Sequence, residues 1–328
     1  FRPPNENELS YSTNNCLILL SPQKLIFTQE KNLEIKKEYI FDGLFDLNTQ
    51  KEIFYNKTCK PIISNFLKGY NGCIMCYGET DTGKTYTIKE IIPSIVSQIF
   101  KYINESDIED ELFKIEVSSF EIYKEKINDL IEVNNKNLNL IQGEINNITN
   151  INVSSQEQMT SILNEVLNLR NIKELQNHVS KSHFIIKINL SHYSKQKNCL
   201  IISKLFLVDL GGSESLSKNK EENEENIEEQ KLINKSLIAL SIIVNNFNIN
   251  NKSNYIPYRD SKLTQIISES LGGNCYTSII LTCSKHQKSA LETRNTLMFG
   301  EKAKNIVNNP IINIQNDFNK EIKNNIYR

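Results

Sequence analysis

Apolar residues alternate between helix-like and strand-like spacing along most of the chain. Residues 86–103 carry Ile and Val at intervals of three and four, which predicts an amphipathic helix. Residues 50–67 and 156–173 have similar spacing, whereas residues 113–123 alternate apolar and polar positions as a half-buried strand does. Further strands are predicted at 17–28, 184–192, 199–209 and 277–283, and further helices at 231–247, 262–271 and 292–307. Strands interleaved with helices predict a layered α/β fold.

A glycine-containing segment lies between a short apolar run and the helix predicted at 86–103. It reads Gly-Glu-Thr-Asp-Thr-Gly-Lys-Thr over residues 78–85, the complete G-x-x-x-x-G-K-[ST] phosphate-binding pattern, and residues 71–77 before it can form a buried strand. In such a loop, backbone N–H groups hold the α- and β-phosphates, Lys84 reaches the β- and γ-phosphates, and the Thr85 hydroxyl binds Mg²⁺. The pattern therefore predicts a nucleotide site made of Gly78, Glu79, Thr80, Asp81, Thr82, Gly83, Lys84 and Thr85.

A second candidate for the same site follows the apolar run at 205–208. Asp209 ends this run, and an Asp at the end of a buried strand faces the Mg²⁺ ion in phosphate-loop enzymes. Gly212 can bring a backbone N–H close to a γ-phosphate because it has no side chain. Taken alone, Asp209 could instead cap a helix or turn, and the run Ser180-Lys181-Ser182-His183 is more typical of a solvated turn.

Composition narrows the class of protein further. The 328 residues have a formal net charge of −1, so no global basic field indicates a nucleic-acid partner. Cys73 and Cys76 are the only two of the seven Cys with C-x-x-C spacing and lie inside the apolar run 71–77, and the four His lack metal-ligand spacing, which fits a reducing compartment. No signal peptide and no apolar run of about 18 residues is present, so we expect no membrane insertion.

The order of these motifs resembles the kinesin motor domain over nearly the whole chain. Phe1-Arg2-Pro3 resembles the family's adenine motif, residues 78–85 its phosphate loop, residues 179–183 its first switch and residues 209–214 its second switch. Residues 233–237, 255–264, 271–274 and 292–300 resemble its remaining motifs, the first two facing tubulin. The resemblance implies an α/β, three-layer, P-loop NTPase fold whose central mixed, mostly parallel β-sheet has helices on both faces.

The resemblance also implies roles for individual residues in binding ATP and Mg²⁺. Arg2 and Pro3 would flank the adenine with Tyr86 packed nearby. Thr85, Ser180 and Asp209 would surround the Mg²⁺ ion, Asp209 through water. Gly212 would sense the γ-phosphate through its amide, and Glu214 would pair with Lys181 and close the site around the attacking water. Hydrolysis would then depend on positioning and electrostatic stabilisation of the transferring phosphoryl group.

Partner and direction follow from the same resemblance. Residues 1–307 would form the motor domain, and residues 308–328 a neck linker with the beginning of a neck helix, as in plus-end-directed kinesins with an N-terminal motor. The protein would form an oligomer through a coiled coil outside these residues and would act in the cytoplasm on the microtubule cytoskeleton, the spindle included. Its tubulin contacts would be Lys218, Lys235, Lys252, Arg259 and Lys262.

Departures from the family pattern keep a second function open. Val179 replaces a Ser and Lys181 an Arg in the first switch, and Glu79 replaces a Gln in the phosphate loop. Residues 87–93 also run directly into the predicted helix, where many kinesins insert a longer loop. These features are compatible with a nucleotide-gated tubulin-binding module of slow ATPase and little motility. A GTPase or nucleotide kinase is disfavoured, because the chain lacks an Asn-Lys-x-Asp guanine motif.

Overall fold

The computed structural model of the chain describes most of its residues. Main-chain positions are given for residues 1–3, 15–29, 32–106, 111–175, 182–196, 198–214, 224–247 and 255–315. Side-chain positions are also given for these residues except 29, 32–35, 171–175 and 224–233. Ser180, Lys181, Lys218 and Lys252 lie outside the described residues, so the roles predicted for them stay predictions.

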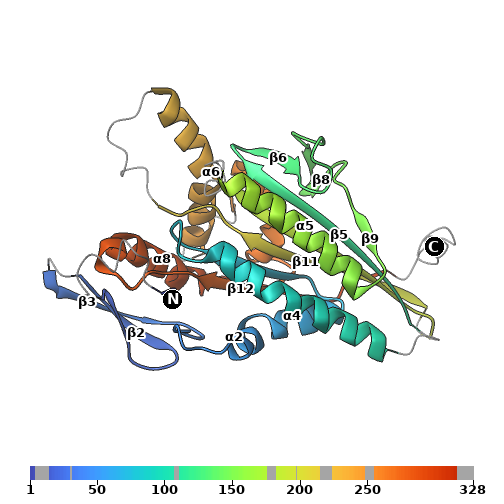
Figure 1. The fold of residues 1–328 in the computed structure, drawn as a ribbon, viewed down its shortest axis with the longest axis horizontal. Coiled ribbons are helices and arrows are strands. Elements are labelled where there is room, and N and C mark those ends of the chain that lie inside the picture. The colour runs from blue at the N-terminus through green and yellow to red at the C-terminus, as the bar shows by residue number, and fades with distance from the viewer. Residues whose placement is uncertain are drawn as a thin grey trace.

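A central sheet of eight strands forms the middle layer (Figure 1). Six of its strands follow one another in the order β12-β4-β11-β10-β5-β6, while β13 pairs with β11 and β9 with β5. Their bounds are β4 Gly72–Tyr77, β5 Glu111–Tyr123, β6 Lys126–Asp129, β9 Ile151–Val153, β10 His183–Ser194, β11 Cys199–Asp209, β12 Tyr276–Leu281 and β13 Ile314–Gln315.

The sheet is mixed, as predicted, but the prediction that it is mostly parallel is wrong. Only the pairs of β4 with β11 and with β12 are parallel among the ladders described. The pairs β10–β11, β5–β10, β5–β6, β5–β9 and β11–β13 are antiparallel. The reason is connection length: β5 is joined to β6, and β10 to β11, by short turns, and a short turn can only return the chain antiparallel.

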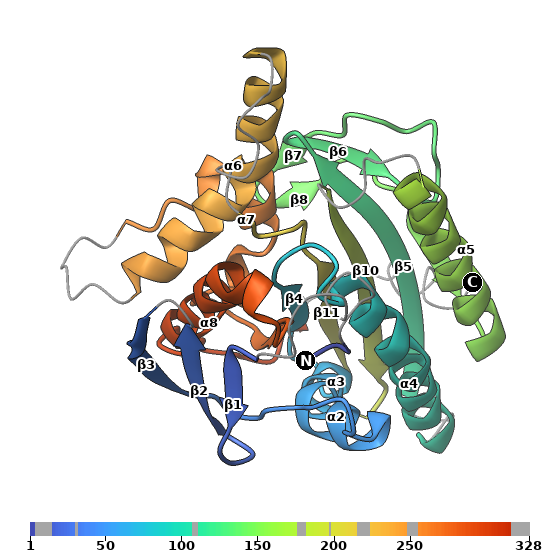
Figure 2. The ribbon, with the colours of Figure 1, turned by 60° about the vertical axis from the view of Figure 1, so that its left-hand side comes forward.

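Helices cover both faces of the sheet, as the sequence predicts. The alternating side chains of β4 show this directly, because Ile74 and Cys76 pack with α3, α4 and α5, whereas Cys73 and Met75 pack with α6, α7 and α8. Figure 2 shows α4 and α5 on one side of the long strands and α6 and α8 on the other. The bounds are α2 Lys51–Thr58, α3 Lys60–Leu67, α4 Lys84–Glu105, α5 Gln156–Leu175, α6 Glu224–Asn246, α7 Lys262–Ile266 and α8 Ala290–Ala303.

Smaller elements complete the fold. A three-stranded antiparallel sheet of β1 (Leu17–Leu19), β2 (Lys24–Gln29) and β3 (Asn32–Ile40) packs beside α8, and a hairpin of β7 (Leu140–Ile141) and β8 (Glu144–Ile145) lies near α7 (Figure 2). Three short 3₁₀ helices are η3 Tyr258–Asp260, η4 Ser268–Ser270 and η5 Gln287–Ser289. None of the helices in the described part of the chain is long and apolar enough to cross a membrane.

Some helix boundaries differ from those predicted. The helix expected over 50–67 is divided at Cys59, where Pro61 occupies the first turn of α3, and the helix expected over 262–271 ends at Ile266 and continues as η4. In contrast, α4 runs without interruption from Lys84 to Glu105 across Pro93. This continuity shows that the chain lacks the longer loop that many kinesins insert there.

Candidate nucleotide site and its coupled surfaces

The phosphate-binding pattern forms the connection predicted from the sequence, between a strand and a helix. Strand β4 ends at Tyr77, and α4 begins at Lys84 after a loop of residues 78–83. Gly83 precedes the helix in the left-handed region, with φ of 101°, a conformation that favours glycine. No side chain in the described part of the chain caps this terminus, so its first N–H groups and the helix dipole can bind an anion.

Lys84 places a buried cation inside this loop. Its side chain is 7% exposed, and Nζ donates hydrogen bonds to the backbone oxygens of Gly78, at 3.0 Å, and Glu79, at 2.8 Å. Burial lowers the pKa of Lys84, while the carboxylates of Asp209 and Glu214 act in the opposite direction. Carbonyl oxygens are weak partners for an ammonium, so phosphate oxygens in the loop would be stronger ones.

Thr85 and Asp209 meet where the resemblance predicted a Mg²⁺ site. Strands β4 and β11 run parallel, with Cys76 level with Asp209, so the end of β11 lies beside the start of the phosphate loop. The Thr85 hydroxyl donates to Oδ2 of Asp209 at 2.6 Å. The other carboxylate oxygen, Oδ1, is buried and has no hydrogen-bond partner among the described residues. A hydroxyl and a spare carboxylate oxygen beside a phosphate loop fit Mg²⁺, which takes oxygen ligands and keeps several waters.

The second switch packs directly against the phosphate loop. Glu214 accepts hydrogen bonds from the Thr80 amide, at 2.9 Å, and the Thr80 hydroxyl, at 2.5 Å. The Ser213 amide donates to the Gly78 oxygen at 3.0 Å. Gly212 lies so close that a Cβ there would come within 2.1 Å of Thr80 Oγ1. Glycine is therefore required at 212 by close packing, and its amide lies beside the loop that would hold the phosphates.

Arg170 is a residue of this site that the sequence interpretation missed. It comes from α5, and its guanidinium lies 3.5 Å from Asp209 Oδ2 while it donates to Oγ of Ser182 at 2.6 Å and to the Ser182 backbone oxygen at 3.1 Å. Both charged side chains are almost fully buried. The signal was present, because Arg170 follows Leu163, Val166 and Leu167 on the apolar stripe of its helix, where a charge needs a buried partner.

His183 joins three segments of the site and was quoted only as part of the first switch. Its Nδ1 accepts from the Gly211 amide at 3.0 Å, which leaves the proton on Nε2, and Nε2 lies 2.6 Å from Oγ of Ser236 on α6. Complete burial lowers the pKa of His183 to about 3, and the nearby cations Arg170 and Lys84 act in the same direction. A neutral imidazole therefore connects both switches to α6.

This burial predicts a loss of stability in acid. Below pH of about 6.5 the unfolded chain binds a proton at His183 that the folded protein excludes until about pH 3. The free energy of unfolding should therefore fall by up to about 1.4 kcal/mol per pH unit between about pH 6.5 and pH 3. Urea unfolding of wild type and His183→Gln as a function of pH measures this. His192→Gln, on the same strand, is the matched control. The prediction is wrong if the free energy of unfolding of His183→Gln falls in acid as steeply as that of wild type.

The predicted adenine residues lie at the surface. Tyr86, in the first turn of α4, is 61% exposed, so its ring can pack against a base. The guanidinium of Arg2 donates to the Pro3 oxygen at 2.7 Å, and the amino group of Phe1 donates to the Phe45 oxygen at 3.0 Å. The adenine contacts of Arg2, Pro3 and Tyr86 stay a prediction.

Three residues of the predicted tubulin face are described. Lys235 lies on the outer face of α6 and Arg259 in η3, and both line one surface groove. Lys262 is half-buried at the start of α7, where its amide donates to Glu125 at 2.8 Å and its Nζ to the Leu138 oxygen at 3.4 Å. Lys262 therefore also has a structural role, holding α7 to the segment before β7.

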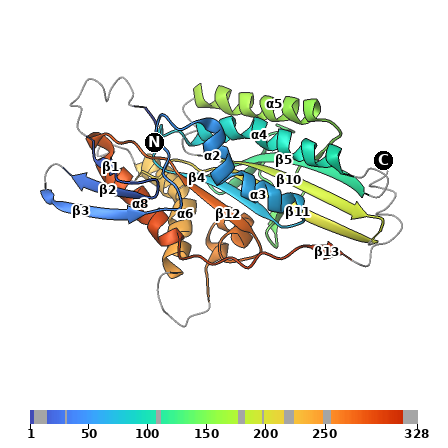
Figure 3. The same ribbon diagram turned by 90° about the horizontal axis from the view of Figure 1, so that it is seen from below.

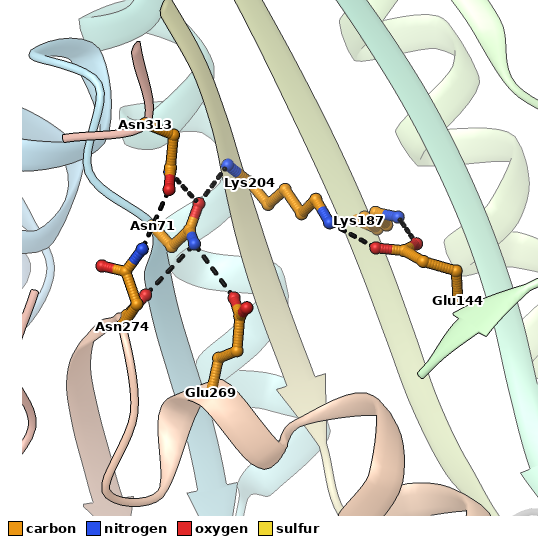
Figure 4. Close-up of polar contacts among 7 residues, drawn as sticks. All are labelled: Asn71, Glu144, Lys187, Lys204, Glu269, Asn274 and Asn313. Atoms are coloured by element: carbon orange, nitrogen blue, oxygen red, sulfur yellow. Dashed lines mark hydrogen bonds and ion pairs between the residues drawn. The ribbon is translucent and has the colours of Figure 1, made fainter. Parts of the chain in front are cut away.

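The C-terminal segment runs along the sheet to β13 (Figure 3) and is bound to the rest of the fold by asparagine side chains (Figure 4). Asn313 donates from Nδ2 to Asn71 Oδ1 at 3.0 Å and accepts from Asn274 Nδ2 at 2.9 Å. Asn71 is buried and donates in turn to Glu269 at 3.0 Å. Beyond these contacts, β13 pairs with the start of β11. Residues up to Gln315 thus lie along the sheet in a defined position.

Figure 4 also shows how the hairpin of β7 and β8 is attached to the sheet. Glu144 forms ion pairs with Lys187 of β10, at 2.8 Å, and with Lys204 of β11, whose own amide donates to Asn71 at 3.1 Å. Partial burial alone would raise the pKa of Glu144, but its bonds to the two lysines lower it below its usual value. Glu144 is the hairpin's charged anchor on the sheet.

Comparisons with known proteins agree with this geometry. The family model described as kinesin motor domain matches residues 1–306. The kinesin-1 heavy chain of Homo sapiens is 37% identical over 96% of this chain, and the kinesin heavy chain isoform 5A of Mus musculus is 39% identical over the same share. The chain spans about a third of the length of these relatives: 33% and 31%. A solved kinesin structure, described as that of a fast kinesin with implications for ATPase mechanism and interactions with microtubules, superposes with a TM-score of 0.88 at 34% identity, covering 96% of this chain and 92% of that one.

Proposed function

Because the chain belongs to the kinesin motor domain family, we propose that it is a microtubule-stimulated ATPase that couples ATP hydrolysis to movement toward the plus end. The observation that carries the proposal is the bond between Thr85 and Asp209, which joins the phosphate loop to the strand that leads into the second switch. Nucleotide chemistry at one end of this strand can therefore change the position of residues 210–214.

The hydrolytic step would be catalysed by positioning and charge. The loop amides and Lys84 would bind the phosphates of ATP, while Thr85, Asp209 and Ser180 would hold Mg²⁺. The bound ion would supply positive charge against the β- and γ-phosphate oxygens. Gly212 would donate its amide to the γ-phosphate, and Lys181 with Glu214 would order the attacking water. The carboxylate of Glu214 contacts Thr80 of the loop, which supports its place next to the phosphates.

Coupling to the microtubule would pass through α6. His183 contacts the second switch through Gly211 and α6 through Ser236, so a shift of either switch acts on that helix. Lys235 on α6 and Arg259 on the neighbouring η3, together with Lys218, Lys252 and Lys262, would contact the acidic surface of tubulin. One imidazole that contacts both the second switch and α6 gives a physical link between nucleotide state and partner binding.

The C-terminal segment supports a plus-end direction. We assign residues 308–328 to a neck linker and the beginning of a neck helix after a motor domain of residues 1–307. Asn308 accepts from the Gly272 amide at 2.6 Å, and Asn313 bonds to Asn71, so the segment is held along the core over residues 308–315. A segment anchored at both ends of this range can deliver a directed displacement to whatever follows it. The same proposal includes that the protein forms oligomers through a coiled coil. It also includes that the protein acts on cytoplasmic microtubules, those of the spindle included.

Two measurements test the proposed function. ATP turnover should rise strongly on adding microtubules, and surface-bound protein should move polarity-marked microtubules with their minus ends leading. ATP turnover that microtubules stimulate, without gliding, would favour the nucleotide-gated binding module. The carboxylates of Glu79 and Asp81 in an anion-binding loop are compatible with such a module. Turnover that microtubules leave unchanged would contradict the motor function, and microtubule binding that does not depend on nucleotide would contradict the binding module.

A further inference from the structure

A groove on the proposed tubulin face has an apolar floor. It has a volume of about 410 Å³, lies between α6 and η3, and is lined by Lys235, Ile238, Ala239, Ile242, Arg259 and Asp260. Ile238 is 51% exposed and Ile242 is 41% exposed. They lie one helical turn apart, so both side chains project from the same face of α6.

These two isoleucines have no evident role in folding. The buried stripe of α6 is made by Leu237, Leu240, Ile243 and Val244, which pack into the core with α7 and α8. Ile238 and Ile242 extend the apolar surface beyond that stripe and are exposed. Single exposed apolar residues are ordinary, but two in one groove with a charged rim match the anatomy of an interface centre.

The rim of this groove carries little net positive charge. The whole chain has a net charge of −1, and of the two cations on the groove rim, Lys235 and Arg259, the second has Asp260 beside it. Exposed charges are also screened over about 8 Å at physiological ionic strength. The cations can orient an acidic partner, but desolvation of the isoleucines must supply much of the affinity.

We propose that Ile238 and Ile242 are the apolar anchors by which this motor binds the microtubule. The partner is a tubulin surface with an apolar ridge between carboxylates, the ridge entering the groove and the carboxylates facing Lys235 and Arg259. This inference rests on the proposed function and adds that binding depends mainly on apolar contact, so that its strength changes less with salt than a purely electrostatic contact would. Affinity that depends on desolvated side chains is lost when those side chains are made polar, whatever the salt concentration.

The test is cosedimentation with stabilised microtubules in a non-hydrolysable ATP analogue over a salt series. Ile238→Ser and Ile242→Ser should each weaken binding about five- to tenfold, and the double variant on the order of 50-fold, by the same factor at every salt concentration. Arg259→Glu should weaken binding most at low salt. Ile53→Ser, at a 47% exposed position on α2, is the matched control and should bind as wild type does. Equal thermal unfolding midpoints would show that all variants are folded.

The outcomes separate this inference from the function on which it rests. If wild type binds microtubules and both isoleucine variants bind within twofold of it, the anchors are wrongly assigned while the proposed function stands. If wild type fails to bind microtubules in any nucleotide state, the proposed function itself fails. If the isoleucine variants keep their microtubule affinity but lose self-association in sedimentation velocity, the groove is a contact between copies of this chain and the inference is overturned.

Discussion

Lys84→Ala is expected to reduce ATP turnover by at least 100-fold, with or without microtubules. The ammonium lies buried within the phosphate loop, and it is the cation that the loop itself provides for the β- and γ-phosphates. Alanine removes this charge while the backbone amides of the loop remain. Steady-state phosphate release measures the effect, and equilibrium titration with a fluorescent nucleotide separates a loss of binding from a loss of turnover.

Lys101→Ala is the matched control for Lys84→Ala. Lys101 lies on the same helix, α4, with its side chain 72% exposed and 3.9 Å from Glu105. An exposed pair of this kind contributes little, so turnover should match that of wild type. Turnover in Lys84→Ala above a few per cent of wild type would contradict the assignment of the phosphate loop as the catalytic centre.

Arg170→Ala is expected to lower the free energy of unfolding by about 3–5 kcal/mol, because it leaves the buried Asp209 without its cation. Turnover should fall as well, since Arg170 also orients Ser182 of the first switch next to the site. Chemical denaturation measures the first effect and single-turnover hydrolysis the second. Arg170→Lys should recover part of the stability, since it restores the charge but not the two-armed contact with Ser182.

Arg294→Ala provides the comparison for this prediction. Arg294 is a half-buried residue of α8 near Tyr39 of β3, and its removal should cost clearly less stability. If the free energy of unfolding of Arg170→Ala is within about 1 kcal/mol of that of wild type, the ion pair of Arg170 and Asp209 does not stabilise the fold as expected for a buried pair. In that case the proposed link between α5 and the switches loses its physical basis.

Much of the nucleotide site was predictable because it is local in the sequence. The phosphate loop, the strand before it and the helix after it are contiguous, so residues 71–103 contain both the pattern and its context. Asp209 could also be placed, since the end of an apolar strand is visible in the sequence and parallel strands end at one edge of a sheet. The structure brings Lys84, Thr85 and Asp209 together at the phosphate loop, and their roles in binding nucleotide and Mg²⁺ stay predictions.

Contacts between distant segments were beyond the sequence. Arg170 lies 39 positions before Asp209 and His183 lies 53 before Ser236, and no local pattern states which partner a buried polar side chain will find. The direction of the strands was misjudged for a related reason, because the family resemblance suggested parallel pairs whereas short turns force β5, β6, β10 and β11 to run antiparallel. Pairing is a property of the assembled sheet.

The sequence by itself determined most of the elements, the phosphate loop and the family, because apolar spacing and contiguous motifs can be recognised in the sequence without the fold. Only the tertiary structure decided that Arg170 bridges Ser182 and Asp209 and that Asn71 holds the C-terminal segment. It also decided that Ile238 and Ile242 remain exposed, since their spacing along the helix does not distinguish them from the buried Leu240 and Val244. Burial depends on what packs against a helix, and that is settled only when the other layers are in place.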